Sequence, residues 1–200
     1  MRIQSDYSHT ISGLFWFDLP LGILLTLLYH NIVRNSLIKN LPFFFKARLF
    51  RFTRFDWNQH FKAFWPTVVI SILIGSASHL LWDAFTHKSG HFVATDPDAY
   101  LRTVDLFGGQ VPMFKILQHS STFIGGLIIL LALIALPSDP SVNRQTNFTY
   151  WLIVFALTFA VVFVRILFGL TFVQYGHLVA TTISAGLVAL TVTPLIVGRK

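Results

Sequence analysis

The sequence of 200 residues contains no cysteine. This absence excludes disulfide bonds, thiolate metal sites and a cysteine nucleophile, so a protein-bound metal would need histidine or acidic side chains. Charged residues are also scarce: they make up 12% of the chain, against about 25% in a soluble domain, whereas hydrophobic residues make up 54%. This balance excludes an ordinary soluble domain and predicts a polytopic membrane protein.

Several sequence motifs of well-known protein classes are missing as well. No Gly-x-Ser-x-Gly elbow is present, although Ser120 and Ser121 follow His119, and this argues against a serine hydrolase. There is no Gly-rich loop after a strand for a nucleotide, and no internal repeat of the kind found in many transporters. The N-terminus is too polar to begin a signal peptide, so the first apolar run is predicted to be a retained membrane helix.

Five apolar runs are each long enough to cross a bilayer, which takes about 20 residues of helix. The predicted spans are residues 11–33, 65–85, 114–136, 148–173 and 177–197. Asp18 and Pro20 interrupt the first, and Pro137 ends the third. We therefore expect an all-α fold, a transmembrane helix bundle that forms a single integral membrane domain over residues 1–200.

Basic residues are concentrated between the first two predicted spans, in residues 34–62. Seven lie there, interleaved with phenylalanines: Arg34, Lys39, Lys46, Arg48, Arg51, Arg54 and Lys62. Alternating basic and aromatic side chains are typical of a segment that lies in the membrane interface and contacts anionic lipid headgroups. We therefore assign the formal net charge of +7 to membrane anchoring and not to nucleic-acid binding.

The same basic segment sets the predicted orientation, because strongly basic loops stay on the cytoplasmic side. Five crossings then place the N-terminus outside and the tail at Arg199 and Lys200 inside. The connection that holds Arg144 is also inside, in agreement with its charge. The comparatively acidic connection over residues 86–113 is outside.

Six of the eight histidines fall at or near span ends on the predicted outer side. His79, Asp83 and His87 follow one another at intervals of four residues, which places them in one stripe on a helix. Ionisable groups near lipid are costly, and an imidazole and a carboxylate one turn apart can bind the same divalent ion, zinc or similar. A further ligand would come from another helix, and His9 and His119 are the best placed.

Other interpretations of this stripe remain open. The three side chains could form a hydrogen-bond network between helices without any metal. Arg165 in the fourth span could neutralise Asp18 or Asp83, or it could hold a phosphate through two parallel hydrogen bonds. Three further histidines are interpreted as ordinary boundary residues, namely His30, His60 and His91.

Three strings in the sequence resemble one family. Residues 8–15 (SHTISGLF), 18–22 (DLPLG) and 78–87 (SHLLWDAFTH) are similar to the bacterial membrane family called domain of unknown function 4184, over nearly the whole chain. The resemblance implies a multi-pass protein of the bacterial cytoplasmic membrane. Such proteins usually open with an extra segment that bears Ser-His-Pro and Pro-Asp elements, so we expect that segment to be missing before residue 7.

A more distant resemblance is to membrane-bound metal-dependent hydrolases. Their pattern pairs a His-Ser or His-Thr with a later His-x-x-x-Asp-x-x-Thr, and the matching positions are His9, Thr10, His79, Asp83 and Thr86. This similarity implies a divalent metal and a hydrolytic reaction on a lipid-linked substrate.

The leading hypothesis is a metal-dependent hydrolase that acts on a lipid or a lipid-linked ester or phosphoester at the outer face. The expected metal ligands are His79, Asp83 and His9. The expected catalytic residues are His87 or His119 for proton transfer and Arg165 for stabilising negative charge. The alternative is a small non-enzymatic transporter, ion-binding or assembly protein, in which the ionisable residues within the spans line a polar path.

Overall fold

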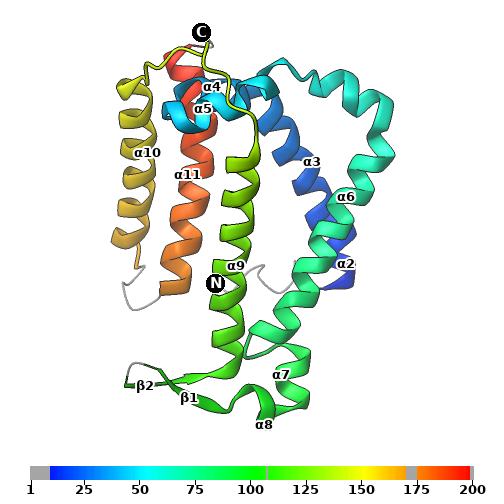
Figure 1. Cartoon of the computed structure of the whole chain (residues 1–200). Helices are drawn as coiled ribbons and strands as arrows, with labels where there is room; N and C mark the ends of the chain where they lie inside the picture. Colours follow the sequence, from blue (N-terminus) through cyan, green and yellow to red (C-terminus); the bar gives the residue numbers. More distant parts are fainter. Residues whose placement is uncertain (1–9, 107, 170–174, 199–200) are drawn as a thin grey trace. The chain divides into compact units, whose positions relative to one another are not determined.

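The computed structural model describes residues 10–106, 108–169 and 175–198. Helices dominate this part of the chain (Figure 1), and five helical stretches are long and apolar enough to cross a membrane. They are Ile11–Asn40, Trp57–Thr95, Met113–Ala135, Phe148–Leu167 and Gly176–Val197. The nearly all-α fold with five spans is thereby confirmed, and the chain is a multi-pass membrane protein.

The chain divides into two compact units. One comprises Met1–Leu24 and Asn58–Ala135, and the other comprises Leu25–Trp57 and Leu136–Lys200. The candidate site lies in the first unit.

The first span is a continuous helix with two widened turns. Helices α2 (Ile11–Gly13), α3 (Leu19–Leu28) and α4 (Arg34–Asn40) are joined by π-helical turns η1 (Leu14–Asp18) and η2 (Tyr29–Val33). The predicted interruption at Asp18 and Pro20 is thus a widening of the helix and not a break. Pro20 has no N–H to donate to a preceding carbonyl, so one backbone hydrogen bond of the helix is missing. A π turn next to the proline accommodates this missing bond.

This helix extends seven residues beyond the predicted end at Val33 because the charge at Arg34 is internally satisfied. The buried Arg34 guanidinium bonds the ring of His30 at 3.0 Å and the carbonyl of Phe55 at 2.8 Å. The helix ends instead where Leu41 adopts an extended conformation ahead of Pro42.

Helix α6 (Trp57–Thr86) contains the second span and is kinked near its start. Phe64 has φ −130° and ψ 29°, outside the helical range, two residues before Pro66. Proline inside a helix clashes with the preceding turn, which accounts for the kink. The helix therefore begins eight residues before the predicted start at Trp65, and the turns ahead of the kink belong to the predicted interfacial segment.

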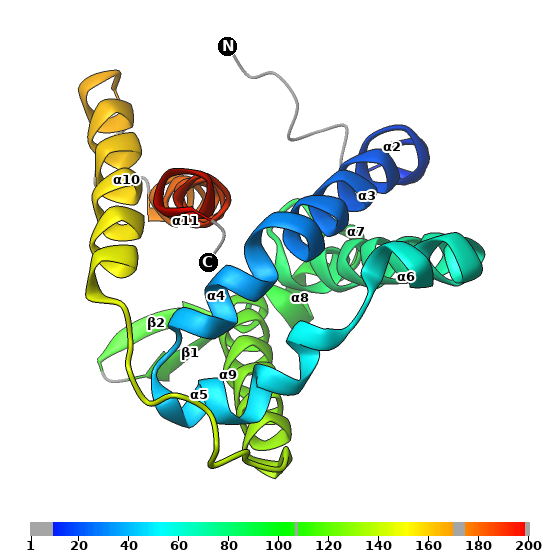
Figure 2. The same cartoon turned by 90° about the horizontal axis from the view of Figure 1, so that it is seen from above.

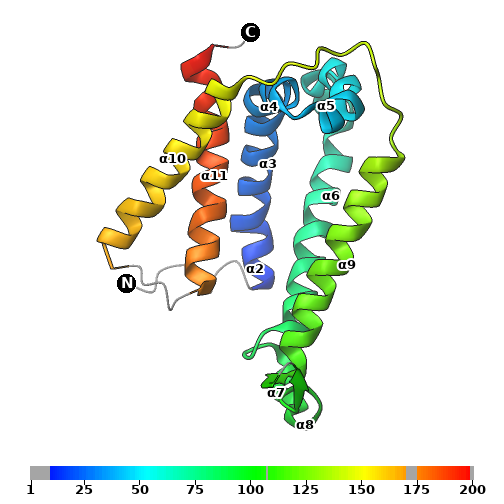
Figure 3. The same ribbon diagram turned by 60° about the vertical axis from the view of Figure 1, so that its left-hand side comes forward.

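The connection between the second and third spans contains secondary structure that the sequence pattern does not predict. Two short helices, α7 (His91–Thr95) and α8 (Pro97–Tyr100), precede an antiparallel hairpin of β1 (Thr103–Leu106) and β2 (Gly109–Pro112). Figure 3 shows this group below the ends of α6 and α9 (Met113–Ala135). The paired glycines are a hairpin signal, and Gly108 has the positive φ of 79° that a tight turn requires.

The second unit contains the last two spans, α10 (Phe148–Leu167) and α11 (Tyr175–Val197), which pack side by side (Figure 2). Their packed core consists of Tyr150, Val154 and Ala189, each at most 5% exposed. The indole of Trp151 donates a 2.6 Å hydrogen bond to the carbonyl of Asn40, which attaches α10 to α4.

The middle of the basic and aromatic segment forms α5 (Phe43–Leu49) and the 3-10 turn η3 (Phe50–Arg54) in this unit. The Lys46 ammonium is buried and donates to the carbonyl of Gln145, and the Asp139 N–H donates to the carbonyl of Ala47 at 2.9 Å. These two bonds fasten the connection between the third and fourth spans onto α5. Guanidinium groups also stack on aromatic rings, with Arg48 over Phe44 and Arg144 over Phe43.

Candidate functional site

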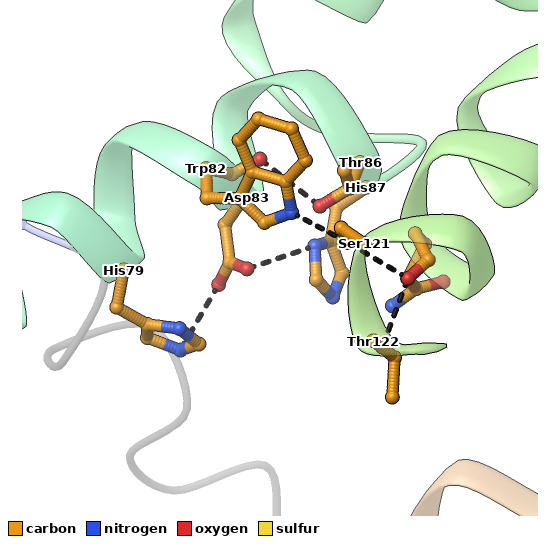
Figure 4. A network of polar contacts seen from close by, with 8 residues as sticks. His79, Trp82, Asp83, Thr86, His87, Ser121 and Thr122 are labelled. Carbon is orange, nitrogen blue, oxygen red and sulfur yellow. Dashed lines mark hydrogen bonds and ion pairs between the residues drawn. The ribbon is translucent and has the colours of Figure 1, made fainter. Parts of the chain in front are cut away.

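Asp83 is the centre of the polar cluster on α6 (Figure 4). Its Oδ2 lies 3.4 Å from Nε2 of His79, and its Oδ1 lies 3.3 Å from Nδ1 of His87. The carboxylate side chain is only 12% exposed, whereas the rings of His79 and His87 are 70% and 48% exposed. A nearly buried carboxylate is therefore flanked on both oxygens by accessible imidazoles.

The helical repeat explains this arrangement. Residues four apart lie about 40° apart around a helix and about 6 Å apart along it, so each histidine reaches the same carboxylate from a neighbouring turn. His87 itself lies just beyond the last residue of α6, yet its N–H still bonds the Asp83 carbonyl at 3.0 Å. The structure thereby brings together the three residues that the sequence pattern grouped.

A glycine holds the turn that follows. The Gly90 N–H donates to the carbonyl of His87 at 2.8 Å. A Cβ atom at Gly90 would lie 2.7 Å from the carbonyl oxygen of Asp83 and 2.5 Å from that of Ala84. Only a residue without a side chain fits this close approach to the end of α6.

Hydrogen bonds to the neighbouring helix hold this end of α6 in place. The indole N–H of Trp82 donates to Ser121 Oγ on α9 at 3.1 Å, and Ser121 in turn donates to the carbonyl of Gln118 at 2.9 Å. The fully buried hydroxyl of Thr86 donates to the Trp82 carbonyl at 3.0 Å. The sequence pattern predicts no role for Trp82 or Ser121, although both can form hydrogen bonds and lie close in sequence to predicted site residues.

The donor chemistry around Asp83 fits a divalent metal. Two ligands bound tetrahedrally to zinc at about 2.1 Å are about 3.4 Å from each other, which matches both nitrogen–oxygen separations. Both are longer than an ordinary charge-assisted hydrogen bond, about 2.8 Å. Both separations are those of imidazole–carboxylate ion pairs, and the same spacing would also suit two ligands of one ion.

The stripe alone cannot complete such a site. His79 and His87 contact different oxygens of the carboxylate, so each ring forms its own pair with Asp83. Within residues 10–106, 108–169 and 175–198, no group of three or more histidine, aspartate or glutamate side chains is arranged to hold a metal.

Two further predicted site residues lie on other helices. His119 is exposed on α9, and Arg165 is exposed near the end of α10 in the second unit. His9 lies outside the residues that the structure describes. Their roles as proton carrier, anion stabiliser and metal ligand stay predictions.

Comparison with known proteins identifies a family but no characterised relative. A family model described as "Domain of unknown function (DUF4184)" matches residues 1–197. No curated protein and no solved structure matches the chain.

Proposed function

The chain belongs to the DUF4184 family, and from that premise we propose that it is a metal-dependent membrane hydrolase. The substrate class that we propose is a lipid or lipid-linked ester or phosphoester. The observation that supports this proposal most directly is the Asp83 carboxylate, which offers one oxygen to each of two exposed imidazoles at the spacing of metal ligands.

In this proposal His79 and Asp83 hold a divalent ion, and His9 supplies a further ligand. The ion would polarise the ester or phosphoryl oxygen and make water a better nucleophile. The partly exposed ring of His87, or that of His119, carries a proton between water and the leaving group, since imidazole titrates near neutral pH.

Two features of the site suit this chemistry. The low exposure of the Asp83 side chain reduces its contact with solvent and strengthens its electrostatic interactions. The neighbouring Trp82–Ser121 bond fixes the helix that carries the ligands, as a catalytic site requires.

Metal analysis of the purified protein tests the proposal. We expect close to one zinc or similar ion per chain in the wild type and at least about a tenfold lower content in the Asp83→Asn and His79→Ala variants. His60→Ala is the matched control, because it removes a histidine from the opposite end of the same helix. The control should keep its metal.

Equal, substoichiometric metal in the wild type and in Asp83→Asn would contradict the metal site. If metal is bound, lipid phosphatase and lipase substrates decide the function, and hydrolysis should be lost in Asp83→Asn and on chelation. Bound metal without hydrolysis of either substrate class would favour the alternative, an ion-binding or transport protein.

The proposed site faces the outside of the bacterial cytoplasmic membrane, with the N-terminus outside and the C-terminus in the cytoplasm. The absence of native cysteine makes this orientation simple to test. A membrane-impermeant maleimide added to intact cells should label Lys88→Cys, next to His87, and should leave Arg51→Cys in η3 unlabelled. The reverse labelling pattern would place the site on the cytoplasmic side.

A further inference from the structure

A second candidate site lies in the other unit, in a groove between α10 and α11. The groove has a volume of about 400 Å³. Its polar lining consists of Arg165 from α10 with His177, Thr181 and Ser184 from α11. Small and branched apolar residues, namely Val161, Ala180, Ala185 and Val188, form the rest. This volume falls in the range of small-molecule sites, about 300–1,000 Å³.

The charge in this groove lacks a counterion on either helix. Arg165 is the only Lys, Arg, Asp or Glu residue between residues 145 and 198, so neither α10 nor α11 supplies an acidic side chain. A guanidinium is always protonated and costly to leave unpaired near lipid. His177 adds a second group that carries positive charge when protonated. The pair is therefore complementary to an anion.

The hydroxyl groups in the groove point to the same ligand chemistry. Other threonines on α11 bond back to the carbonyl four residues earlier, as Thr182 does to Leu178 at 2.9 Å and Thr191 does to Leu187 at 2.8 Å. For Thr181 and Ser184 no such bond is present among the described residues. Their hydroxyls are therefore free to donate to a ligand, and phosphate oxygens accept several such bonds.

The groove is polar at one end and apolar along its length. Arg165 and His177 lie near the ends of their helices that adjoin the connection between α10 and α11. Val161 and Val188 lie farther along, and the lining on α11 extends over about 16 Å from His177 to Val188. A ligand with an anionic head and an apolar chain matches this gradient. A soluble anion would leave the apolar part unfilled.

We propose that the groove between α10 and α11 binds an anionic phospholipid, with the phosphate at Arg165 and His177 and an acyl chain beside Val161 and Val188. Thr181 and Ser184 donate hydrogen bonds to the phosphate or glycerol oxygens. None of the lining residues belongs to the cluster at Asp83, and the proposed lipid site does not depend on the proposed hydrolase activity.

The test is lipid binding to the whole protein, purified in neutral detergent and titrated with phosphatidylglycerol or phosphatidylcholine in native mass spectrometry. We expect preferential retention of phosphatidylglycerol by the wild type. Arg165→Gln should weaken this binding by about tenfold or more, the usual effect of losing a charged hydrogen bond. Arg144→Gln, the matched control, removes the same charge from the same unit outside the groove and should bind as the wild type does.

A second variant tests the proposal independently, in case Arg165→Gln does not fold. Thr181→Val combined with Ser184→Ala keeps the volume and charge of the groove, and we expect a roughly threefold to tenfold weaker affinity for phosphatidylglycerol. Glycerol 3-phosphate tests whether a soluble phosphate is the true ligand, and it should not displace the lipid. Displacement at an equal concentration, unchanged binding by both groove variants, or equal loss in Arg144→Gln would each overturn the proposal.

Discussion

The indole nitrogen of Trp82 lies 3.1 Å from Ser121 Oγ, and this hydrogen bond joins α6 to α9 at the residue before Asp83. It connects two apolar helices by a polar contact within a largely lipid-facing surface, since Trp82 is 45% exposed. Polar bonds of this kind are the main directional contacts between membrane helices. The position of Asp83 therefore depends on a contact that lies outside the histidine stripe.

Ser121→Ala removes this bond while leaving the helix intact. We expect the free energy of unfolding in detergent to fall by about 0.5–1 kcal/mol, the range found for hydrogen bonds between membrane helices. Denaturant titration followed by circular dichroism measures the change. Ser120→Ala removes an exposed hydroxyl from the adjacent position and should leave the stability unchanged. An equal loss in both variants would show that the bond contributes nothing specific.

Gly90→Ala should displace the turn that holds His87. The new methyl group would lie within 2.7 Å of two carbonyl oxygens, a contact that only a shift of backbone can relieve. We expect a loss of about 1–3 kcal/mol in unfolding free energy. Gly125→Ala on α9 is the control, because nothing lies within 4 Å of its added Cβ, and it should be neutral or slightly stabilising. A stable Gly90→Ala protein would mean that the turn adapts at no cost.

Burial lowers the pKa of Lys46 from its ordinary value of 10.5. The folded state then disfavours the protonated form of Lys46. The destabilisation caused by burying this charge is complete below the lowered pKa, and it disappears as the pH rises toward 10.5. We therefore expect the stability of the wild type to rise over that window relative to Lys46→Met. Parallel unfolding experiments across this pH range measure the difference. A constant difference would show that Lys46 titrates normally.

Hydrogen bonds from a neighbouring residue lower the pKa of Asp139 below its ordinary value. The hydroxyl of Ser141 donates to its carboxylate at 2.6 Å and the Ser141 N–H donates at 3.0 Å, and these bonds lower the Asp139 pKa from 3.8, with a smaller effect from Arg54. The ionised Asp139 carboxylate therefore stabilises the folded state fully above a pH of about 4. This stabilisation is lost as the pH falls through the lowered pKa.

Ser141→Ala should therefore raise the Asp139 pKa back toward 3.8, and Arg54→Gln should raise it less. Carboxyl carbon shifts in aspartate-labelled protein measure both, with Asp139→Asn as the assignment control. A larger shift in Arg54→Gln would reverse the order of causes and make charge attraction the dominant one.

The sequence predicts the spans well because a bilayer selects helices by apolar length. The third prediction, residues 114–136, differs by a single residue at each end from α9. The larger errors occur where polar groups are satisfied within the protein. Arg34 does not end its helix because His30 and Phe55 accept its hydrogen bonds, and these partners cannot be read from local hydropathy.

The candidate site was predictable only where it is local. The contact of Asp83 with His79 and His87 follows from helix spacing alone. The bond from Trp82 to Ser121 joins residues 39 positions apart, and the groove at Arg165 depends on how two helices pack. Such contacts between helices have no periodic signal in the sequence.

The two rings beside Asp83 face it with different nitrogens, Nε2 of His79 and Nδ1 of His87. The carboxylate therefore meets two different ring positions, and the nitrogen on the far side of the ring is Nδ1 in His79 and Nε2 in His87. The two histidines are chemically inequivalent, so they are not interchangeable as ligands or as carriers of a proton.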